Sequence, residues 1–481
     1  MLKYNRLIIV LVAGLSWGCK VNVTPVKTDH LRLPKSYGSL SAEGSASLPE
    51  ARSFFGDDKL TALIDTVLHN NFDLQTALQK IELARAGVRY MKGVNLPDLS
   101  ASLVLGQRKF GKYTIDGVGN YDTGFSDNIS DKQQIPGPVV PDYFVGLQSS
   151  WEADLWGKLK SKQKAAAARF IATEFGRDLI RTTLVAEVAG AYFELTILDN
   201  ERNILEENIR LQQSALDIVR VLKQAGEANQ LGVELLSAQL LSSKALKVEV
   251  NQKIVETENT INFLLGRFPQ SIDRTALSRD QILPPQMKAG VPSALLANRP
   301  DIRQAEMELM ATNADVFSAK AAFYPSLNIN ATMGLQAFKA VLLFEPASFA
   351  YTLAGGLTAP LLNRRAIIAN LMASEAEQKQ AYINYQKTVV NSFTEVYNYL
   401  NLIDNTNQMY DLKAEEVDIL KVSIETSSEL FKSGRATYLE VITAQKNALQ
   451  SQIELINLKK KQFNAVIGLY KSLGGGWNKA L

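Results

Sequence analysis

Residues 325–335 read Pro-Ser-Leu-Asn-Ile-Asn-Ala-Thr-Met-Gly-Leu, and residues 349–358 read Phe-Ala-Tyr-Thr-Leu-Ala-Gly-Gly-Leu-Thr. In both stretches large apolar side chains alternate with small or polar ones. Because successive side chains of a strand point to opposite faces, the alternation predicts two strands with one apolar face each. Strands of about ten residues with this pattern are typical of a transmembrane β-barrel. An antiparallel sheet that packs on a soluble core is the alternative interpretation.

Two further segments of the same kind lie nearer the N-terminus, and the one from Leu99 to Leu105 is weaker than the other three. We therefore expect four strands in two pairs, at about residues 96–107 and 143–154 and at about residues 324–336 and 349–360. Aromatic side chains gather near the ends of these segments, as they do in the interfacial girdle of a barrel. The aromatic residues are Tyr143, Trp151, Tyr324, Phe349 and Tyr351.

Two long runs contain no proline: none lies between Pro141 and Pro269, and none follows Pro360. Proline breaks helix interiors, and both runs are rich in the helix-forming residues Ala, Leu, Glu, Gln and Lys. Apolar residues at 4/3 spacing indicate packing like that of a coiled coil. One glycine interrupts each run, which divides the two runs into four helices. The expected helices cover residues 157–225, 227–266, 363–432 and 437–472.

The chain contains an internal repeat. Asn70 recurs as Asn298 at an offset of 228 residues, and Gly226 recurs as Gly434 at an offset of 208. Each repeat is expected to run helix, strand, loop, strand, long helix, glycine turn, helix. The first repeat is placed at residues 57–290, the second at residues 291–473, and a C-terminal tail at residues 474–481.

The first strand-to-strand loop, around Gly106 to Tyr143, is longer than the second and rich in Gly, Asp, Asn and Pro. It is expected to be an outer loop, because the long loops of such barrels face the exterior. Four strands cannot close a barrel, since an open edge in lipid leaves backbone groups unpaired. Copies of the chain must therefore share the barrel: two copies would supply eight strands and three would supply twelve, which leaves a lumen.

The composition excludes several classes of function. The formal charge of the 481 residues is +3, so no nucleic acid partner is expected. One Cys and two His exclude a disulfide framework and a Cys/His zinc site, so we expect no metal and no cofactor. No pattern of catalytic residues is evident, and we expect no enzyme.

The N-terminus reads as a secretory leader. Lys3 and Arg6 precede a nine-residue apolar stretch that begins at Leu7, and the only cysteine, Cys19, follows. We expect residues 1–18 to be a lipoprotein signal peptide, Cys19 to be the acylated residue, with palmitate among its acyl chains, and residues 19–56 to be a linker. An ordinary signal peptide with an incidental cysteine is the alternative.

Five segments resemble those of a known family. They begin with Trp-Glu-Ala-Asp-Leu-Trp-Gly, which joins a predicted strand to a long helix, and they follow one another in the family's order. The five segments are 151–157, 292–302, 319–327, 356–361 and 469–477. In these segments the chain resembles the TolC-like outer-membrane factors, in the OprM/NodT branch of efflux lipoproteins.

The resemblance implies a fold that is mainly α with β. A transmembrane β-barrel, with four strands per chain and twelve in a homotrimer, is continued by a long periplasmic α-helical barrel. It implies a place in the outer membrane, lipid-anchored and inserted through the barrel, extending into the periplasm. The implied partners are a periplasmic adaptor, an inner-membrane transporter and the lipid of the outer membrane.

The resemblance also assigns roles to the two glycine turns, which would form the periplasmic tips. Candidate contacts with the adaptor are Gly226, Leu231, Val233, Gly434 and Val441. The second tip would carry the aperture, with an acidic position at Glu440; a second family acid would fall at Thr443, which is not acidic. The full set of aperture candidates is Phe431, Arg435, Tyr438, Leu439, Glu440 and Thr443. Ordinary packing between helices is the alternative role for each of these residues.

The predicted function is that of a passive exit duct, the outer-membrane channel of a tripartite efflux system. A duct for type I protein secretion is the alternative. A structural coiled-coil lipoprotein of the envelope, which transports nothing, is a further one. The sequence does not indicate the cargo.

Overall fold

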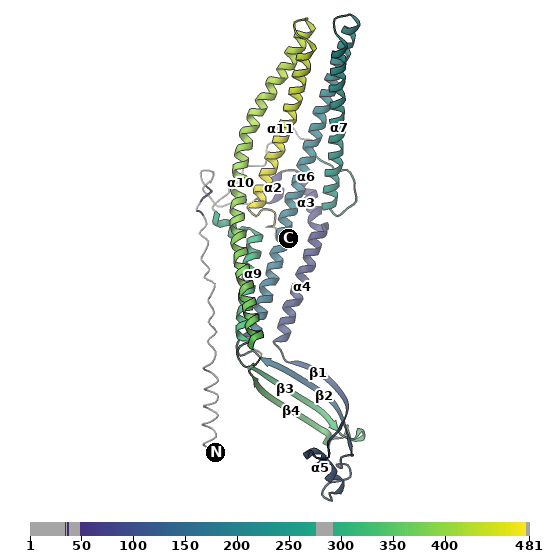
Figure 1. Cartoon of the computed structure of the whole chain (residues 1–481), viewed down its shortest axis with the longest axis vertical. Coiled ribbons are helices and arrows are strands. Elements are labelled where there is room, and N and C mark those ends of the chain that lie inside the picture. The colour runs from purple at the N-terminus through teal and green to yellow at the C-terminus, as the bar shows by residue number, and fades with distance from the viewer. Residues whose placement is uncertain are drawn as a thin grey trace. The chain divides into compact units, whose positions relative to one another are not determined.

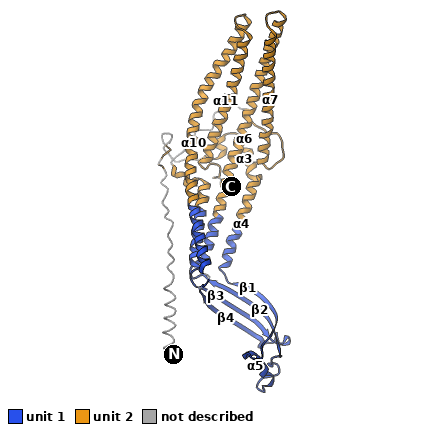
Figure 2. Cartoon of the chain, in the orientation of Figure 1, with its two compact units in different colours: residues 1–28, 83–170, 307–382 blue, residues 29–82, 171–306, 383–481 orange. Residues whose placement is uncertain are grey.

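The computed structural model describes residues 34, 36–37, 49–275, 292–360, 362 and 364–477. The described chain forms two compact units (Figure 2). The first contains Leu83–Phe170 and Met307–Tyr382. The second contains the described residues of Asp29–Glu82, Ile171–Glu306 and Ile383–Leu481. Each unit combines segments of both predicted repeats, so the repeats are not separate compact bodies.

The first unit contains one antiparallel sheet of four strands in the order β1-β2-β3-β4 (Figure 1). The strands are β1 (Asp98–Lys109), β2 (Val139–Ala153), β3 (Ser326–Ala337) and β4 (Phe349–Thr358). β2 begins four residues before its predicted start, because Val139 and Val140 extend the ladder opposite Lys109 and Arg108. In this sheet β1 and β4 are edge strands, each with one neighbour.

The register of the sheet separates its two faces. Leu103 pairs with Val145, Val145 with Leu335, and Leu335 with Phe349, so these apolar side chains share one face. The next row, one residue along, consists of Ser102, Gly146, Gly334 and Ala350. The alternation read from the sequence is therefore continued in register across all four strands.

Between β1 and β2 the chain forms α5 (Ile115–Asp122) and a 3₁₀ turn, η2 (Thr123–Phe125), where a loop was predicted. Thr114 caps α5: its hydroxyl accepts a hydrogen bond from the amide of Gly117. In this short helix the structure buries no residue, so its amphipathic pattern could not signal it in the sequence. Two more 3₁₀ turns, η4 (Ala340–Leu342) and η5 (Pro346–Ser348), connect β3 to β4.

Four long helices follow the strand pairs. These are α6 (Lys158–Gln224), α7 (Gln230–Leu264), α10 (Arg364–Lys432) and α11 (Tyr438–Ser472) (Figure 1). α6 has 67 residues and α10 has 69, which at a rise of 1.5 Å per residue makes each about 100 Å long. Across the helices described, none has an apolar stretch long enough to cross a membrane.

The shorter helices precede the strand pairs. They are α2 (Ala51–Phe55), α3 (Asp58–Asn70), α4 (Phe72–Val94), η3 (Pro292–Ala294), α8 (Leu295–Asn298) and α9 (Pro300–Ala321). The starts of equivalent elements confirm the internal repeat: α9 begins 228 residues after α4, α10 begins 206 after α6, and α11 begins 208 after α7. The predicted helices at 157–225 and 227–266 correspond to α6 and α7, with a five-residue turn between them.

Aromatic rings lie at the centre of the core of the second unit. Phe193 of α6 stacks on Phe463 of α11 with ring centroids 4.3 Å apart, and Phe54 of α2 stacks on Tyr470 of α11 at 4.5 Å. Burial raises the pKa of the Tyr470 hydroxyl. The short helix α2 thus packs against the end of α11, and the core joins both repeats.

Candidate functional site: the hairpin tips and a neighbouring cavity

The first tip joins α6 to α7 through Gly226. This glycine has φ +82°, a left-handed conformation that glycine adopts without the strain other residues incur. The amide of Glu227 donates to the carbonyl of Leu222 at 2.9 Å, which closes the C-terminus of α6. Asn229 then caps α7, its side-chain oxygen accepting from the amide of Gly232 at 3.0 Å. The predicted glycine turn is therefore present as a tight, doubly capped reversal.

The second tip joins α10 to α11 and uses the same device. Gly434 has φ +70°, and the amide of Arg435 donates to the carbonyl of Leu430 at 2.8 Å. Thr437 caps α11 and forms a capping box with Glu440. The amide of Thr437 donates to the Glu440 carboxylate at 2.9 Å, and the Thr437 hydroxyl also contacts that carboxylate.

Glu440 thus has a structural role at the start of α11. Its hydrogen bond with the Thr437 hydroxyl holds the pKa of the Glu440 carboxyl below its ordinary value. The carboxylate is exposed, so it carries a negative charge at neutral pH on the surface of the tip. The Thr-x-x-Glu spacing is a capping signal that can be recognised in the sequence, but it was not part of the prediction for Glu440.

Tyr438 connects the two tips. A Cβ placed on Gly232 would lie 3.1–3.2 Å from atoms of the Tyr438 ring, so the ring rests directly on the backbone of α7. The Tyr438 hydroxyl donates to the Asn229 side-chain oxygen at 3.3 Å. Val233 and Phe431 pack with Tyr438 around a buried cluster of α6 and α7 side chains. The residues of this cluster are Leu216, Val219, Leu236 and Leu240.

The remaining predicted tip residues divide by exposure. Leu231 and Leu439 are the exposed apolar side chains, at 53% and 57%, while Val441 is buried at 6% and packs within the chain. Thr443 is exposed. Arg435 and Glu440 line one groove of about 530 Å³ beside α10. The structure therefore brings Arg435 and Glu440 together in a groove, and Val233, Phe431 and Tyr438 in an apolar cluster.

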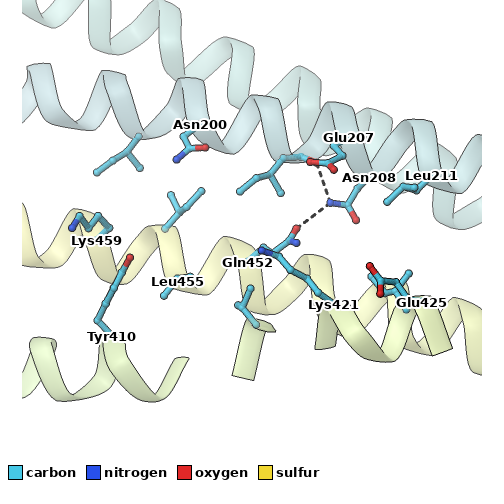
Figure 3. A pocket seen from close by; sticks show the side chains of 15 residues that line it. Asn200, Glu207, Asn208, Leu211, Tyr410, Lys421, Glu425, Gln452, Leu455 and Lys459 are labelled. Carbon is cyan, nitrogen blue, oxygen red and sulfur yellow. Dashed lines mark hydrogen bonds between the residues drawn. The ribbon is translucent and has the colours of Figure 1, made fainter. Parts of the chain in front are cut away.

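A larger cavity of about 620 Å³ lies between α6, α10 and α11 (Figure 3). Lys459 lies near Tyr410 and Asn200 at one end, and Glu425 lies at the other end. The Lys459 ammonium is 5.2 Å from the centre of the Tyr410 ring and 5.7 Å from that of Phe463. Burial lowers the pKa of Lys459.

The wall of this cavity is partly polar. The Asn208 side-chain amide donates to the carbonyl of Ile204 at 3.0 Å and to the side-chain oxygen of Gln452 at 3.2 Å (Figure 3). This cavity could not be predicted from the sequence, because its walls come from three helices whose facing residues are up to about 260 positions apart.

Metal ligation has no basis in the described segments, where no three His, Cys, Asp or Glu side chains form a group that could hold a metal ion. Cys19, the predicted acylation site, lies outside the residues that the structure describes.

Comparison with known proteins identifies the architecture. The chain matches the family described as "Outer membrane efflux protein" over residues 63–267 and 291–475. It is 28% identical to the solvent efflux pump outer membrane protein SrpC of Pseudomonas putida over 448 residues, which cover 92% of this chain and 91% of SrpC. It is 27% identical to the cation efflux system protein CusC of Escherichia coli (strain CFT073) over 428 residues, 89% of this chain and 88% of CusC.

The fold is also that of a solved channel. The open-state outer membrane channel MtrE of Neisseria gonorrhoeae superposes with a TM-score of 0.79 at 24% identity, over 95% of this chain and 98% of MtrE. The predicted fold class is confirmed: the chain is mainly helical with one four-stranded antiparallel sheet, and it has the fold of a solved outer membrane channel. The predicted location in the outer membrane is confirmed as well. The chain belongs to the outer membrane efflux protein family, whose members are channel proteins rather than enzymes.

Proposed function

We propose that this protein is the exit duct of a tripartite efflux system, which passes cargo delivered by an inner-membrane transporter and a periplasmic adaptor. The observation that carries the proposal is the sheet, whose apolar face is in register across four strands and whose two edges pair with no strand among the described residues. A sheet with one apolar and one small or polar face suits a wall between lipid and a water-filled lumen. A sheet of this kind is useful in a channel, and no catalytic role requires it.

A homotrimer completes the barrel in this proposal. Three copies of the sheet supply twelve strands, each β1 pairing with the β4 of a neighbour, so that no edge is left in lipid. Native mass spectrometry of the protein purified in detergent measures the number of copies. A mass of three chains supports this assembly, whereas a monomer or a dimer would contradict it.

The tips meet the adaptor and close the aperture in this proposal. Leu231 and Leu439 are exposed apolar side chains that can pack against a partner, and the turns at Gly226 and Gly434 give each hairpin a compact end. Glu440 from three copies would form a negative ring at the aperture that favours cations. Arg435, Tyr438 and Phe431 are the candidates for contacts that keep the aperture shut.

Crosslinking in cells tests the adaptor contact. A photoreactive amino acid at Leu231 or Leu439 should capture the adaptor, because both side chains are exposed at the tips. The same probe at Val118, which is exposed in α5 between β1 and β2, is the control and should not capture it. Equal capture at both places would refute the assignment of the tips as the docking end.

The cargo is set by the transporter in this proposal. SrpC is named for solvent efflux and CusC for cation efflux, yet the chain is about equally similar to both. A type I protein secretion duct is the second candidate, because a shared barrel would serve it equally. A structural lipoprotein that transports nothing is disfavoured, because such a protein does not need a sheet with a polar face.

Lipidation of Cys19 is part of the proposal. The cysteine is the only one in the chain and follows a leader-like apolar stretch, which supports acylation after cleavage. Mass spectrometry of the mature N-terminal peptide should show an acylated Cys19, and Cys19→Ser should remove the acyl mass. An unmodified thiol, or a mature chain that starts elsewhere, would contradict it.

A further inference from the structure

Six exposed basic side chains lie on the helices that adjoin the end of the sheet where the strands meet the helices. Arg89 and Lys92 lie in the last turns of α4, which leads into β1. Lys160, Lys162 and Lys164 lie in the first turns of α6, which follows β2. Arg365 is the second residue of α10, which follows β4. We call these six residues the interfacial basic patch; all belong to the first compact unit.

The charges of this patch are not neutralised by the chain. Across the described residues, no carboxylate lies within ion-pair distance of any of the six. The nearby acids are otherwise engaged: Glu152 pairs with Lys158, and Asp154 accepts the backbone amide of Lys160. Asp98 also lies at this end of the sheet, at the start of β1. The patch therefore presents a clear excess of positive charge.

Helix stability does not account for the lysines. A positive charge in the first turns of a helix opposes the helix dipole, and the first turn of α6 contains no acidic residue. Helical side chains lean toward the N-terminus, so the lysines of α6 and Arg365 lean toward the sheet. Lys160 and Lys164, four residues apart, share one face of α6, whereas Lys162 lies on another face, so the three lysines are distributed around the start of the helix.

Exposed apolar side chains border the patch on the side of the strands. Leu96 is 66% exposed, Leu155 58%, Trp156 53% and Leu362 99%. The Trp156 ring stacks on Tyr324, and its indole N–H donates to the carbonyl of Pro325 at 2.7 Å, which fixes the ring at this level. Tryptophan and tyrosine are enriched where hydrocarbon meets headgroups. These residues follow or precede the strands directly in the sequence, at the end of the sheet that adjoins the helices.

We propose that the interfacial basic patch binds the anionic headgroups of phospholipids in the leaflet that faces the periplasm. The apolar border places the end of the strands at the edge of the hydrocarbon layer, and the lysines and arginines lie at the level of the phosphates. Basic residues next to a membrane attract anionic lipid, and the attraction is screened by salt. The proposal rests on the barrel in the membrane and does not require the efflux partners.

A lipid titration tests the proposal. The full-length protein in neutral detergent is titrated with phosphatidylglycerol, and bound lipids are counted by native mass spectrometry. The K160Q/K162Q/K164Q variant should bind phosphatidylglycerol at least about tenfold more weakly than the wild type. The matched control K244Q/K387Q/K446Q removes three exposed lysines of the second unit and should bind like the wild type. A second variant, R89Q/R365Q, repeats the test with other residues of the patch.

The lipid controls separate the sources of the phosphate group. Phosphatidylcholine, which is zwitterionic, should bind equally weakly to all variants, and inorganic phosphate should not compete at equal concentration. Equal binding of phosphatidylglycerol to the wild type and to both patch variants would overturn the proposal. Full competition by inorganic phosphate would overturn it too, since a free anion would then suffice. The conductance of the variants is measured separately, so a failure here leaves the duct function intact.

Discussion

At the scale of single residues, Glu440 combines a structural and an electrostatic role that two substitutions separate. Glu440→Gln keeps an oxygen that can accept from the Thr437 amide but removes the charge, whereas Glu440→Ala removes both. Because the pKa of Glu440 is lowered, the wild-type carboxylate stays charged down to pH values below its ordinary pKa. Both variants should therefore lose part of the cation preference at pH 7, as reversal potentials in a salt gradient measure.

The capping role of Glu440 predicts a second difference. Loss of a helix cap costs about 1 kcal/mol, so Glu440→Ala should also loosen the start of α11, while Glu440→Gln should loosen it less. Hydrogen exchange of the amides at Leu439–Val441 measures this. Unchanged ion selectivity in both variants would remove Glu440 from the aperture, and equal exchange would remove it from the cap.

The position of Gly334 leaves no room for a larger side chain inside the sheet. A Cβ at this position would lie 2.4 Å from the carbonyl oxygen of Val145 and 2.6 Å from the Cα of Gly146, both backbone atoms that cannot yield. Gly334→Ala should therefore destabilise the folded sheet by roughly 1–3 kcal/mol, the usual range for overpacking. Thermal unfolding in detergent measures the loss. Gly355→Ala on β4, where a Cβ meets no atom within 4 Å, is the control; an equal loss there would refute the packing argument.

Prediction from sequence succeeds at residues whose role is local. Gly226 and Gly434 could be found, because a glycine that interrupts a helical run marks a turn with positive φ. The contact of Tyr438 with Gly232 could not be found, since these residues are 206 positions apart and meet only through the packing of α7 against α11. Lys459 was missed for the same reason, because neither its burial nor its aromatic neighbours follow from its place in the helix.

At the scale of elements, Tyr438 predicts coupling between the two hairpins. Tyr438→Ala removes the ring that rests on Gly232, so both tips should become more mobile. Because the aromatic side chain is half-buried, the free energy of unfolding should fall by about 2 kcal/mol. Tyr438→Phe removes only the long hydrogen bond to Asn229 and should behave like the wild type. Hydrogen exchange at Gln230–Gly232 should rise in the alanine variant. Unchanged exchange in α7 would show that the hairpins are not coupled through this ring.

Arg299 joins three helices of the second unit. Its guanidinium is 8% exposed and donates to Asp301 of α9 at 2.6 Å, to Glu395 of α10 at 2.8 Å and to the carbonyl of Ser472 of α11 at 2.9 Å. Burial alone would lower the pKa of Arg299, but the carboxylates of Asp301 and Glu395 outweigh it and raise the pKa. Asp301 thus has a role beyond the helix dipole that its position in the sequence suggested.

Arg299→Met should destabilise the protein by about 3 kcal/mol, because it removes the cationic partner of two carboxylates and the side-chain donor to the buried carbonyl of Ser472. Chemical unfolding in detergent measures the change. Arg303→Met is the comparison: Arg303 is 37% exposed and pairs with Glu306 on the same helix, so its loss should cost less than about 1 kcal/mol. Equal losses of stability in the two variants would mean that the hydrogen bonds of Arg299 to three helices add no more stability than one exposed ion pair.

Secondary-structure elements were easier to predict than the contacts between them. Proline-free runs and glycine turns predict α6, α7, α10 and α11, because long helices are determined by local composition. The helix α5 was not predicted, since its sequence Ile-Asp-Gly-Val-Gly-Asn-Tyr-Asp holds two glycines and has no buried face. The early start of β2 was missed because Pro141 weakens the strand signal.

At the scale of the whole molecule, the central claim is that identical chains share one barrel with a water-filled lumen. This claim depends on the edges of β1 and β4, which pair with no described strand, and on the two-faced register, which the alternation in the sequence predicts. The number of copies does not follow from one chain, because strands alone allow two copies or three.

Single-channel recording is the most direct test of that claim. The purified full-length protein is added to a planar lipid bilayer, and the current is recorded under an applied voltage at several salt concentrations. A shared barrel predicts discrete steps of one size whose conductance rises with salt concentration, in the wild type and in aperture variants that leak more. A bilayer that stays silent for all of these proteins, with the chain recovered as a soluble monomer, would contradict the account.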